Sequence, residues 1–107
     1  MTSDGSAYSR FRRALETGNI HLVVTAALEL PYISLPDALR IVLVYRDGDP
    51  GRYERAAVRW LGRFCLEAKG LKIEDVQAAA DALHVLPEHP AQGMEALQEI
   101  CVARGIR

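Results

Sequence analysis

The stretch from Ile33 to Ala68 constrains the fold more than any other, because it holds two helical patterns joined by a turn of only a few residues. In the first pattern, apolar residues recur at helical spacing and cover most of the circumference. A helix that is apolar on most sides is buried in a globular protein. At about a dozen residues it is also too short to cross a membrane. The pattern therefore predicts a central buried helix with the other helices packed around it.

The two ends of this central helix carry capping residues. Ser34 is placed to accept a hydrogen bond from a free amide in the first turn, and Asp37 completes a Ser-x-x-Asp capping pattern. At the other end, Gly48 suits the left-handed position that follows a helix, Asp49 suits a cap and Pro50 suits the first turn of the next helix.

The second helix of the stretch has an apolar face and should run to about Lys69, with Gly70 after its end. Its apolar residues at i, i+3, i+4 and i+7 spacing are Tyr53, Ala56, Ala57, Trp60, Leu61, Phe64 and Ala68. Beside them, arginines step by three, four and four residues, which places them on one side of a helix. We call this row, formed by Arg52, Arg55, Arg59 and Arg63, the arginine ridge.

The rest of the chain predicts four further helices. The first starts at Ser6 and ends at Gly18, and the second, capped by Asn19, covers 20–30. The fifth covers about 73–86, and the sixth is opened by Pro90 and ended by Gly105. Residues 1–5 are expected to be disordered and 6–107 to form one domain. The inward-facing residues outside the central pair are predicted to be Tyr8, Phe11, Ala14, Leu15, Val23, Val24, Ala27, Leu30, Val76, Ala79, Ala80, Leu83, Leu86, Met94, Leu97, Ile100 and Cys101.

An internal echo spans much of the chain. Shifted by 38 residues, Ile33, Leu35, Asp37, Ala38, Ile41 and Val42 fall on Leu71, Ile73, Asp75, Val76, Ala79 and Ala80. A period near 40 residues with two helices per unit resembles HEAT-like α-solenoid repeats over residues 19–104. The resemblance implies a stack of αα-hairpins. The alternative is a compact orthogonal helical bundle.

Composition and motifs exclude several classes of function. The net charge of −1 argues against the class of nucleic-acid-binding proteins that are basic over their whole surface. A protein with this net charge can still carry a local basic patch. The N-terminus lacks the apolar core of a signal peptide and no membrane-spanning stretch follows, so we expect a cytoplasmic protein. Cys65 and Cys101 are expected to be reduced thiols. No catalytic or cofactor motif is present, and His21, His84 and His89 have no metal-ligand spacing, so neither an enzyme, a cofactor nor a metal is predicted.

The arginine ridge is the candidate binding surface. Its arginines can be neutralised by neighbouring acids, or their stems can cover apolar surface between helices. The third interpretation is a contact surface for an anionic partner, which Arg10, Arg12 and Arg13 would extend. We expect a small non-enzymatic interaction module that binds an acidic protein. The alternative is a nucleic-acid-binding accessory protein using the same face, with an enzyme third, and self-association is left open.

Overall fold

The chain was analysed as a computed structural model that describes residues 3–107. Within that range it is all-helical and has no strand, which confirms the predicted fold class. None of its helices is long and apolar enough to cross a membrane. The elements are α1 (Ser3–Thr17), α2 (Ile20–Leu28), α3 (Leu35–Gly48), the short 3-10 helix η1 (Pro50–Arg52), α4 (Tyr53–Glu67), α5 (Ile73–Val85) and α6 (Pro90–Ala103).

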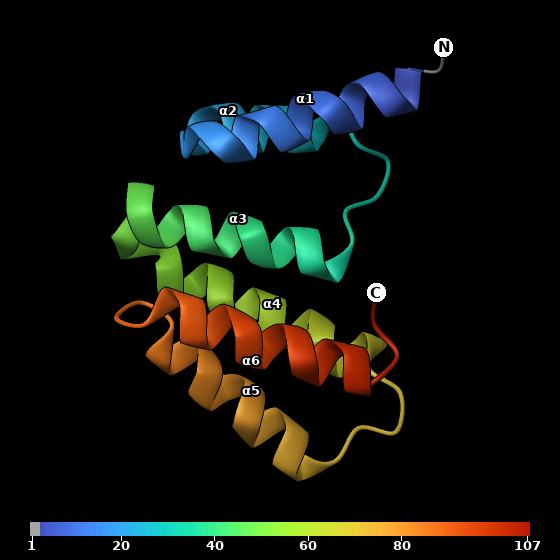
Figure 1. Cartoon of the computed structure of the whole chain (residues 1–107), viewed down its shortest axis with the longest axis vertical. Coiled ribbons are helices and arrows are strands. Elements are labelled where there is room, and N and C mark those ends of the chain that lie inside the picture. Colours follow the sequence, from blue (N-terminus) through green and yellow to red (C-terminus); the bar gives the residue numbers. More distant parts are fainter. Residues whose placement is uncertain (1–2) are drawn as a thin grey trace.

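The helices form three antiparallel pairs that follow one another along the longest axis of the molecule, α1 with α2, α3 with α4, and α5 with α6 (Figure 1). The overall dimensions are 42 × 29 × 20 Å. The second pair meets the first through α3, which packs on both α1 and α2. The third pair places α5 against α4 and α6 against α3. The contact of α3 with α2 is repeated by that of α5 with α4, whereas the contact of α3 with α1 is followed by one of α6 with α3. The HEAT-like resemblance stays a prediction.

Two hydrophobic clusters meet at α3. The larger joins α3, α4, α5 and α6, and the smaller joins α1 and α2 to the other side of α3. Leu35, Leu39 and Val42 belong to the larger cluster, whereas Val44 belongs to the smaller one. The prediction of a central buried helix is thus confirmed. The smaller cluster is completed by Phe11, Ala14, Val23 and Ala26, and the larger by Tyr53, Ala57, Trp60, Phe64, Ala79, Ala82, Leu83, Leu86, Leu97, Cys101 and Ile106.

Trp60 fixes α4 against α3. Its indole is 3% exposed, stacks on Phe64 with ring centroids 5.7 Å apart, and donates its N–H to the Leu35 carbonyl at 2.9 Å. The N–H therefore has a partner inside the core, as a buried polar group requires. Around it, Leu39 and Val42 are buried, whereas Leu43 and Leu61 are half-buried.

Several of the predicted helix caps are confirmed. The Ser34 hydroxyl accepts from the Asp37 N–H at 3.2 Å, and the Asn19 side chain caps α2. Gly18, Gly70 and Gly105 all have positive φ. Asp37, however, does not bond back to the cap in the way that the pattern predicted. Its carboxylate accepts from the Tyr8 hydroxyl at 3.0 Å and the Arg40 guanidinium at 2.8 Å.

The turn between α3 and α4 differs from the prediction. Gly48 is not left-handed but is the last residue of α3, and Asp49 makes no side-chain cap bond. The chain reverses at Asp49 (φ −153°, ψ 69°) because a following proline disfavours the helical conformation. Pro50 then opens η1 rather than α4 itself.

Other boundaries shift by a few residues. α1 begins at Ser3 rather than Ser6, so 3–5 are helical, and residues 1 and 2 of the segment expected to be disordered lie outside the described residues. α2 ends at Leu28, because the next two amides bond to carbonyls only three residues back. α4 ends at Glu67, where Ala68 turns extended.

The prediction of inward-facing residues was wrong at three positions. Tyr8, Val24 and Ala80 are exposed. Tyr8 lies at the rim of the fold, where its hydroxyl donates to Asp37, and Ala80 lines an open groove between α4 and α5.

Candidate functional site

The arginine ridge is positioned by the buried face of α4. Tyr53, Ala57, Trp60 and Phe64 anchor that face in the larger cluster, which turns the arginines toward the side of the helix. Arg52 belongs to η1 and the other three arginines to α4. The four side chains do not share one environment, and their contacts divide them into three kinds.

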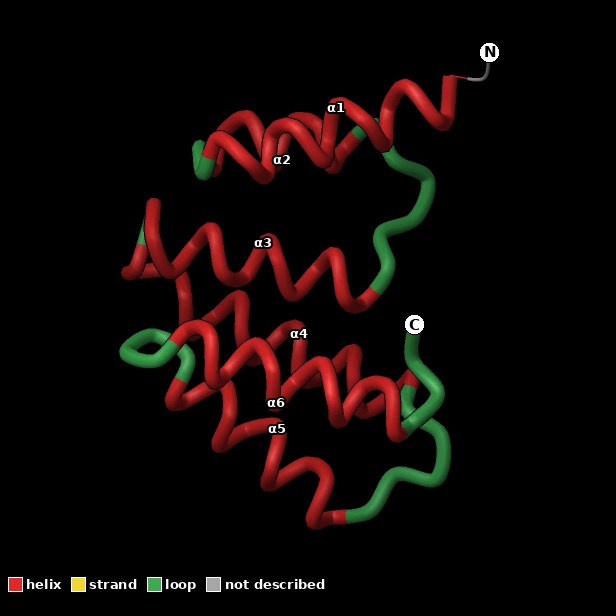
Figure 2. The backbone as a smooth tube through the Cα atoms, viewed as in Figure 1, coloured by secondary structure: helices red, strands yellow, loops and turns green. Residues whose placement is uncertain are grey.

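Arg63 is a structural residue. Its guanidinium donates to the Ile33 carbonyl at 2.6 Å and to the Tyr32 hydroxyl at 3.2 Å, and lies over the Tyr32 ring at 5.4 Å. Its Nε forms an ion pair with Glu67, four residues along α4. Arg63 thereby fastens the loop 29–34, which links α2 to α3 (Figure 2), to the side of α4. The interpretation of the ridge as an ion-pair and packing network is confirmed for this residue.

Arg52 forms one weak contact and is intermediate between the structural Arg63 and the open arginines. Its Nε lies 3.4 Å from the Asp49 carboxylate, and its side chain is 73% exposed. An exposed pair at this distance is weak, because water screens it and both side chains lose freedom. Arg52 therefore remains accessible to a further anionic group.

Arg55 and Arg59 are the open part of the ridge. Both are exposed, and neither forms a salt bridge with the side chains of residues 6–107. Together with Arg52, Tyr45 and Ala56 they line a shallow hollow of about 300 Å³ on the side of the α3/α4 pair. Arginines four residues apart on one helix repel each other, by roughly 0.2–0.5 kcal/mol per pair. An anion in this hollow would relieve that repulsion.

The arginines of α1 lie in another layer. α1 packs on α2 and α3, and in Figure 1 α3 lies between α1 and α4. Arg10 forms a salt bridge with Glu29 at 2.8 Å, and Arg12 lies over the Tyr8 ring at 6.0 Å. Arg13 is exposed. These three residues do not line the hollow beside Arg55 and Arg59, so their role as an extension of the ridge lacks support from the geometry.

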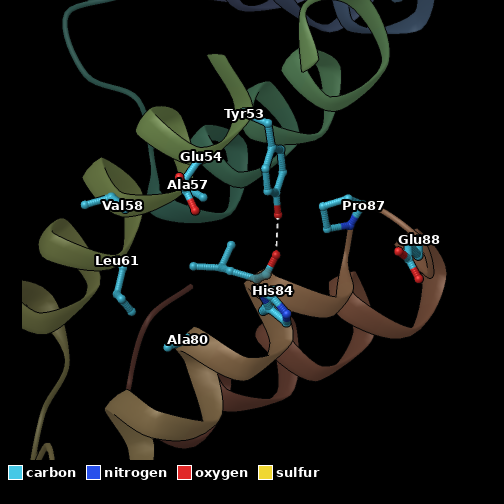
Figure 3. A pocket seen from close by; sticks show the side chains of 10 residues that line it. Tyr53, Glu54, Ala57, Val58, Leu61, Ala80, His84, Pro87 and Glu88 are labelled. Carbon is cyan, nitrogen blue, oxygen red and sulfur yellow. Dashed lines mark hydrogen bonds between the residues drawn. The ribbon is translucent and has the colours of Figure 1, made fainter. Parts of the chain in front are cut away.

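Reasoning from the sequence missed a groove between α4 and α5. Figure 3 shows its floor, where the Tyr53 hydroxyl donates to the Leu83 carbonyl at 2.7 Å. In an uninterrupted helix that carbonyl would accept from the N–H of residue 87, but residue 87 is proline and has none. The groove has a volume of about 410 Å³. Its lining is Tyr53, Glu54, Ala57, Val58, Leu61, Ala80, Leu83, His84, Pro87 and Glu88.

Pro87 was the only signal for this arrangement in the sequence, because a proline four residues after Leu83 leaves a carbonyl that needs another donor. The identity of that donor depends on how α4 packs on α5. Burial raises the pKa of Tyr53 to about 12, and the nearby Arg46 lowers it by a smaller amount. The hydroxyl therefore stays protonated and donates near neutral pH.

The cysteines and histidines are dispersed. Cys65 is half-buried and Cys101 buried, both as free thiols, and burial raises the pKa of Cys101 to about 11. His21 and His84 are exposed on α2 and α5, and His89 precedes α6 without a side-chain cap bond. In the part of the chain that the structure describes, no three His, Cys, Asp or Glu residues gather as a metal site would require.

Comparisons with models of protein families, with curated proteins and with solved structures found no match to this chain.

Proposed function

We propose that this chain is a non-enzymatic helical interaction module that binds an acidic partner protein through Arg52, Arg55 and Arg59. The observation that carries the proposal is the open pair Arg55 and Arg59, which are exposed and form no salt bridge with the side chains of residues 6–107. Arginine presents five donors in a planar fork, which matches the two oxygens of a carboxylate. The expected partner therefore carries Asp or Glu side chains.

A protein partner is favoured over nucleic acid by what surrounds the arginines. Val58 and Leu66 lie on the same outer side of α4 and are 63% and 87% exposed. Aliphatic side chains contribute to a protein interface by leaving water, but they add little to contacts with a phosphate backbone.

Binding of an unstructured acidic probe tests the charge requirement. A fluorescent 20-residue poly-glutamate peptide and a 20-base-pair DNA duplex are titrated with the protein across a salt series. We expect the peptide to bind at low salt and the Arg55→Glu/Arg59→Glu variant to lose at least tenfold in affinity. The matched control is Arg13→Glu/Arg107→Glu, which reverses two exposed arginines elsewhere and makes the same change in net charge. That control should keep most of the affinity.

Three outcomes contradict the proposal. Equal losses in both double variants mean that only net charge matters. Tighter binding to the duplex, with the steep salt dependence of phosphate contacts, favours the nucleic-acid alternative. Absence of peptide binding at low salt removes the ridge as an acidic-protein site.

A further inference from the structure

The outer surface of α4 carries a row of residues four apart, Val58, Gly62 and Leu66, directly beside the row that contains Arg55 and Arg59. Both end residues of the first row are largely exposed, and Gly62 is exposed between them. We propose that this row is the docking site of an amphipathic helix of the acidic partner, which crosses α4 over Gly62. This inference rests on the proposed function for the charge of the partner, and adds its secondary structure and point of contact.

Gly62 is the least expected residue of the row. A glycine in the middle of a helix costs about 0.5–1 kcal/mol relative to alanine. The fold itself does not require it, because a Cβ at this position would meet no atom within 4 Å, and its φ is not positive. The absence of a side chain instead leaves a dip between Val58 and Leu66.

Gly93 shows what such a dip does inside the same protein. A Cβ at Gly93 would lie 2.8 Å from Leu86 Cβ and 2.9 Å from Leu86 Cα, so glycine is what lets α6 approach α5 so closely. The dip at Gly62 lets a helix of another protein approach α4 equally closely. A large side chain of that helix would fit between Val58 and Leu66, as the side-chain ridges of one helix pack into the grooves of another.

A helix is the occupant that this surface favours. An extended peptide binds well when it extends a sheet, because its backbone groups then find partners. Residues 3–107 contain no strand and therefore no sheet edge. A helix satisfies its backbone internally and needs only side-chain contacts.

Charge argues against an antiparallel pairing of α4 with a second copy of this chain. In that two-fold pairing across Gly62, the row of Arg55 and Arg59 would face the same row of the other copy. Glu67, the acidic residue of that row, is already paired with Arg63. The expected partner helix therefore carries acids four residues apart on one edge and a large apolar residue beside them.

A displayed library of helical 21-residue peptides tests this inference. The surface positions are randomised over Glu, Lys, Leu, Ala and Gln, and selection is performed on the wild-type protein. We expect enriched peptides to combine acids four apart with an adjacent apolar stripe, and a selected peptide to bind at least tenfold more tightly than a scrambled peptide of the same composition. Enrichment without that pattern, or no enrichment, overturns the inference.

Variants of the protein then locate the contact. Gly62→Trp should weaken the selected peptide at least tenfold, whereas Gln77→Trp, a matched change at an exposed position of α5, should leave it unchanged. Gly62→Ala should keep or raise the melting temperature, and a fall would show that the fold needs this glycine and would overturn the argument.

The two proposals fail in different ways. If Arg55→Glu/Arg59→Glu abolishes binding of poly-glutamate while Gly62→Trp has no effect on the selected peptide, the helix inference fails and the acidic-partner function stands. If the arginine variant leaves poly-glutamate binding intact, the function fails first. A dimer by light scattering that Gly62→Trp dissociates would identify a second copy as the occupant and overturn the inference.

Discussion

At the scale of single residues, several long-range polar contacts hold the fold together, each from a side chain to a backbone carbonyl. Trp60 donates to the Leu35 carbonyl, Tyr53 to that of Leu83, and Arg63 to that of Ile33. A buried carbonyl without a donor costs about 1–3 kcal/mol. These side chains therefore do more than fill space.

Tyr53→Phe should destabilise the protein by about 1–3 kcal/mol at neutral pH, because the Leu83 carbonyl loses its donor. The pH dependence gives a second signature. A tyrosine in the unfolded chain has a pKa of about 10, whereas burial raises the pKa of Tyr53 to about 12 in the folded protein. Between these values the folded state binds more protons, so the free energy of unfolding falls as the pH rises.

Urea unfolding of both proteins from pH 8 to 12 measures this effect. The stability that Tyr53 provides is present below pH 10 and is lost as the pH approaches 12, so the difference between wild type and Tyr53→Phe should shrink over that range. Cys101, whose pKa is raised to about 11, contributes equally to both proteins and cancels. A constant difference would contradict the buried donor.

Arg63→Ala should lower the free energy of unfolding by about 1–2 kcal/mol, because it removes the bond to Ile33 and the contact with Tyr32. Arg59→Ala, the matched change one turn earlier, should stay within about 0.5 kcal/mol of wild type, as for most surface positions. Chemical denaturation compares the two. Equal losses would mean that Arg59 also belongs to the structural network.

At the scale of elements, helix ends and faces could be predicted wherever the information is local. Asn19, Ser34 and Gly18 act within a few residues of where they stand, so their roles are visible in the sequence. The sequence did not show that the arginine ridge divides into a structural arginine, Arg63, and the open arginines Arg55 and Arg59. The partners of Arg63 come from residues 32 and 33, some thirty positions away, and only the packing of α3 on α4 brings them together.

The same limit explains the errors in the candidate site. The extension by Arg10, Arg12 and Arg13 assumed that exposed basic residues share a surface, but α1 and α4 lie in different layers. The groove between α4 and α5 depends on an angle between helices that periodicity does not encode. Gly62 was present in the sequence, but its meaning required knowing that no neighbour fills the space in front of it.

Substitutions of Gly62 in α4 and Gly93 in α6 are expected to have opposite effects on stability. Gly93→Ala should destabilise the protein by about 1–3 kcal/mol, because the added methyl group overlaps Leu86 and forces α5 and α6 apart. Gly62→Ala should stabilise it by about 0.5–1 kcal/mol through helix propensity alone. Thermal unfolding followed by circular dichroism measures both. The same sign for both substitutions would contradict the packing described.

At the scale of the whole molecule, the two hydrophobic clusters differ greatly in size. Among the described residues, fourteen buried apolar side chains form the larger cluster, and five form the smaller one that holds α1 and α2 to α3. Local opening requires less free energy where fewer apolar contacts are broken. The first pair is therefore the less stable part of the domain.

Native-state hydrogen exchange should show this division. Amides in the middle of α1 and α2 should exchange through a partial opening, at a free energy below that of the amides in the middle of α3, α4 and α6. Val44→Ala, which weakens the smaller cluster, should increase the gap, whereas Leu97→Ala should lower the protection of the second and third pairs instead. Identical exchange free energies throughout would mean that the domain opens only as one unit.

The shared position of α3 also sets an order of events during synthesis. The α1/α2 hairpin leaves the ribosome before the helix that covers it, with Phe11 and Val23 still lacking the Val44 side of their cluster. α3 in turn has one face that stays uncovered until α4, α5 and α6 follow. The α1/α2 hairpin thus waits only for α3, whereas the second face of α3 waits for the final helix, and a nascent chain paused before residue 50 exposes that apolar face.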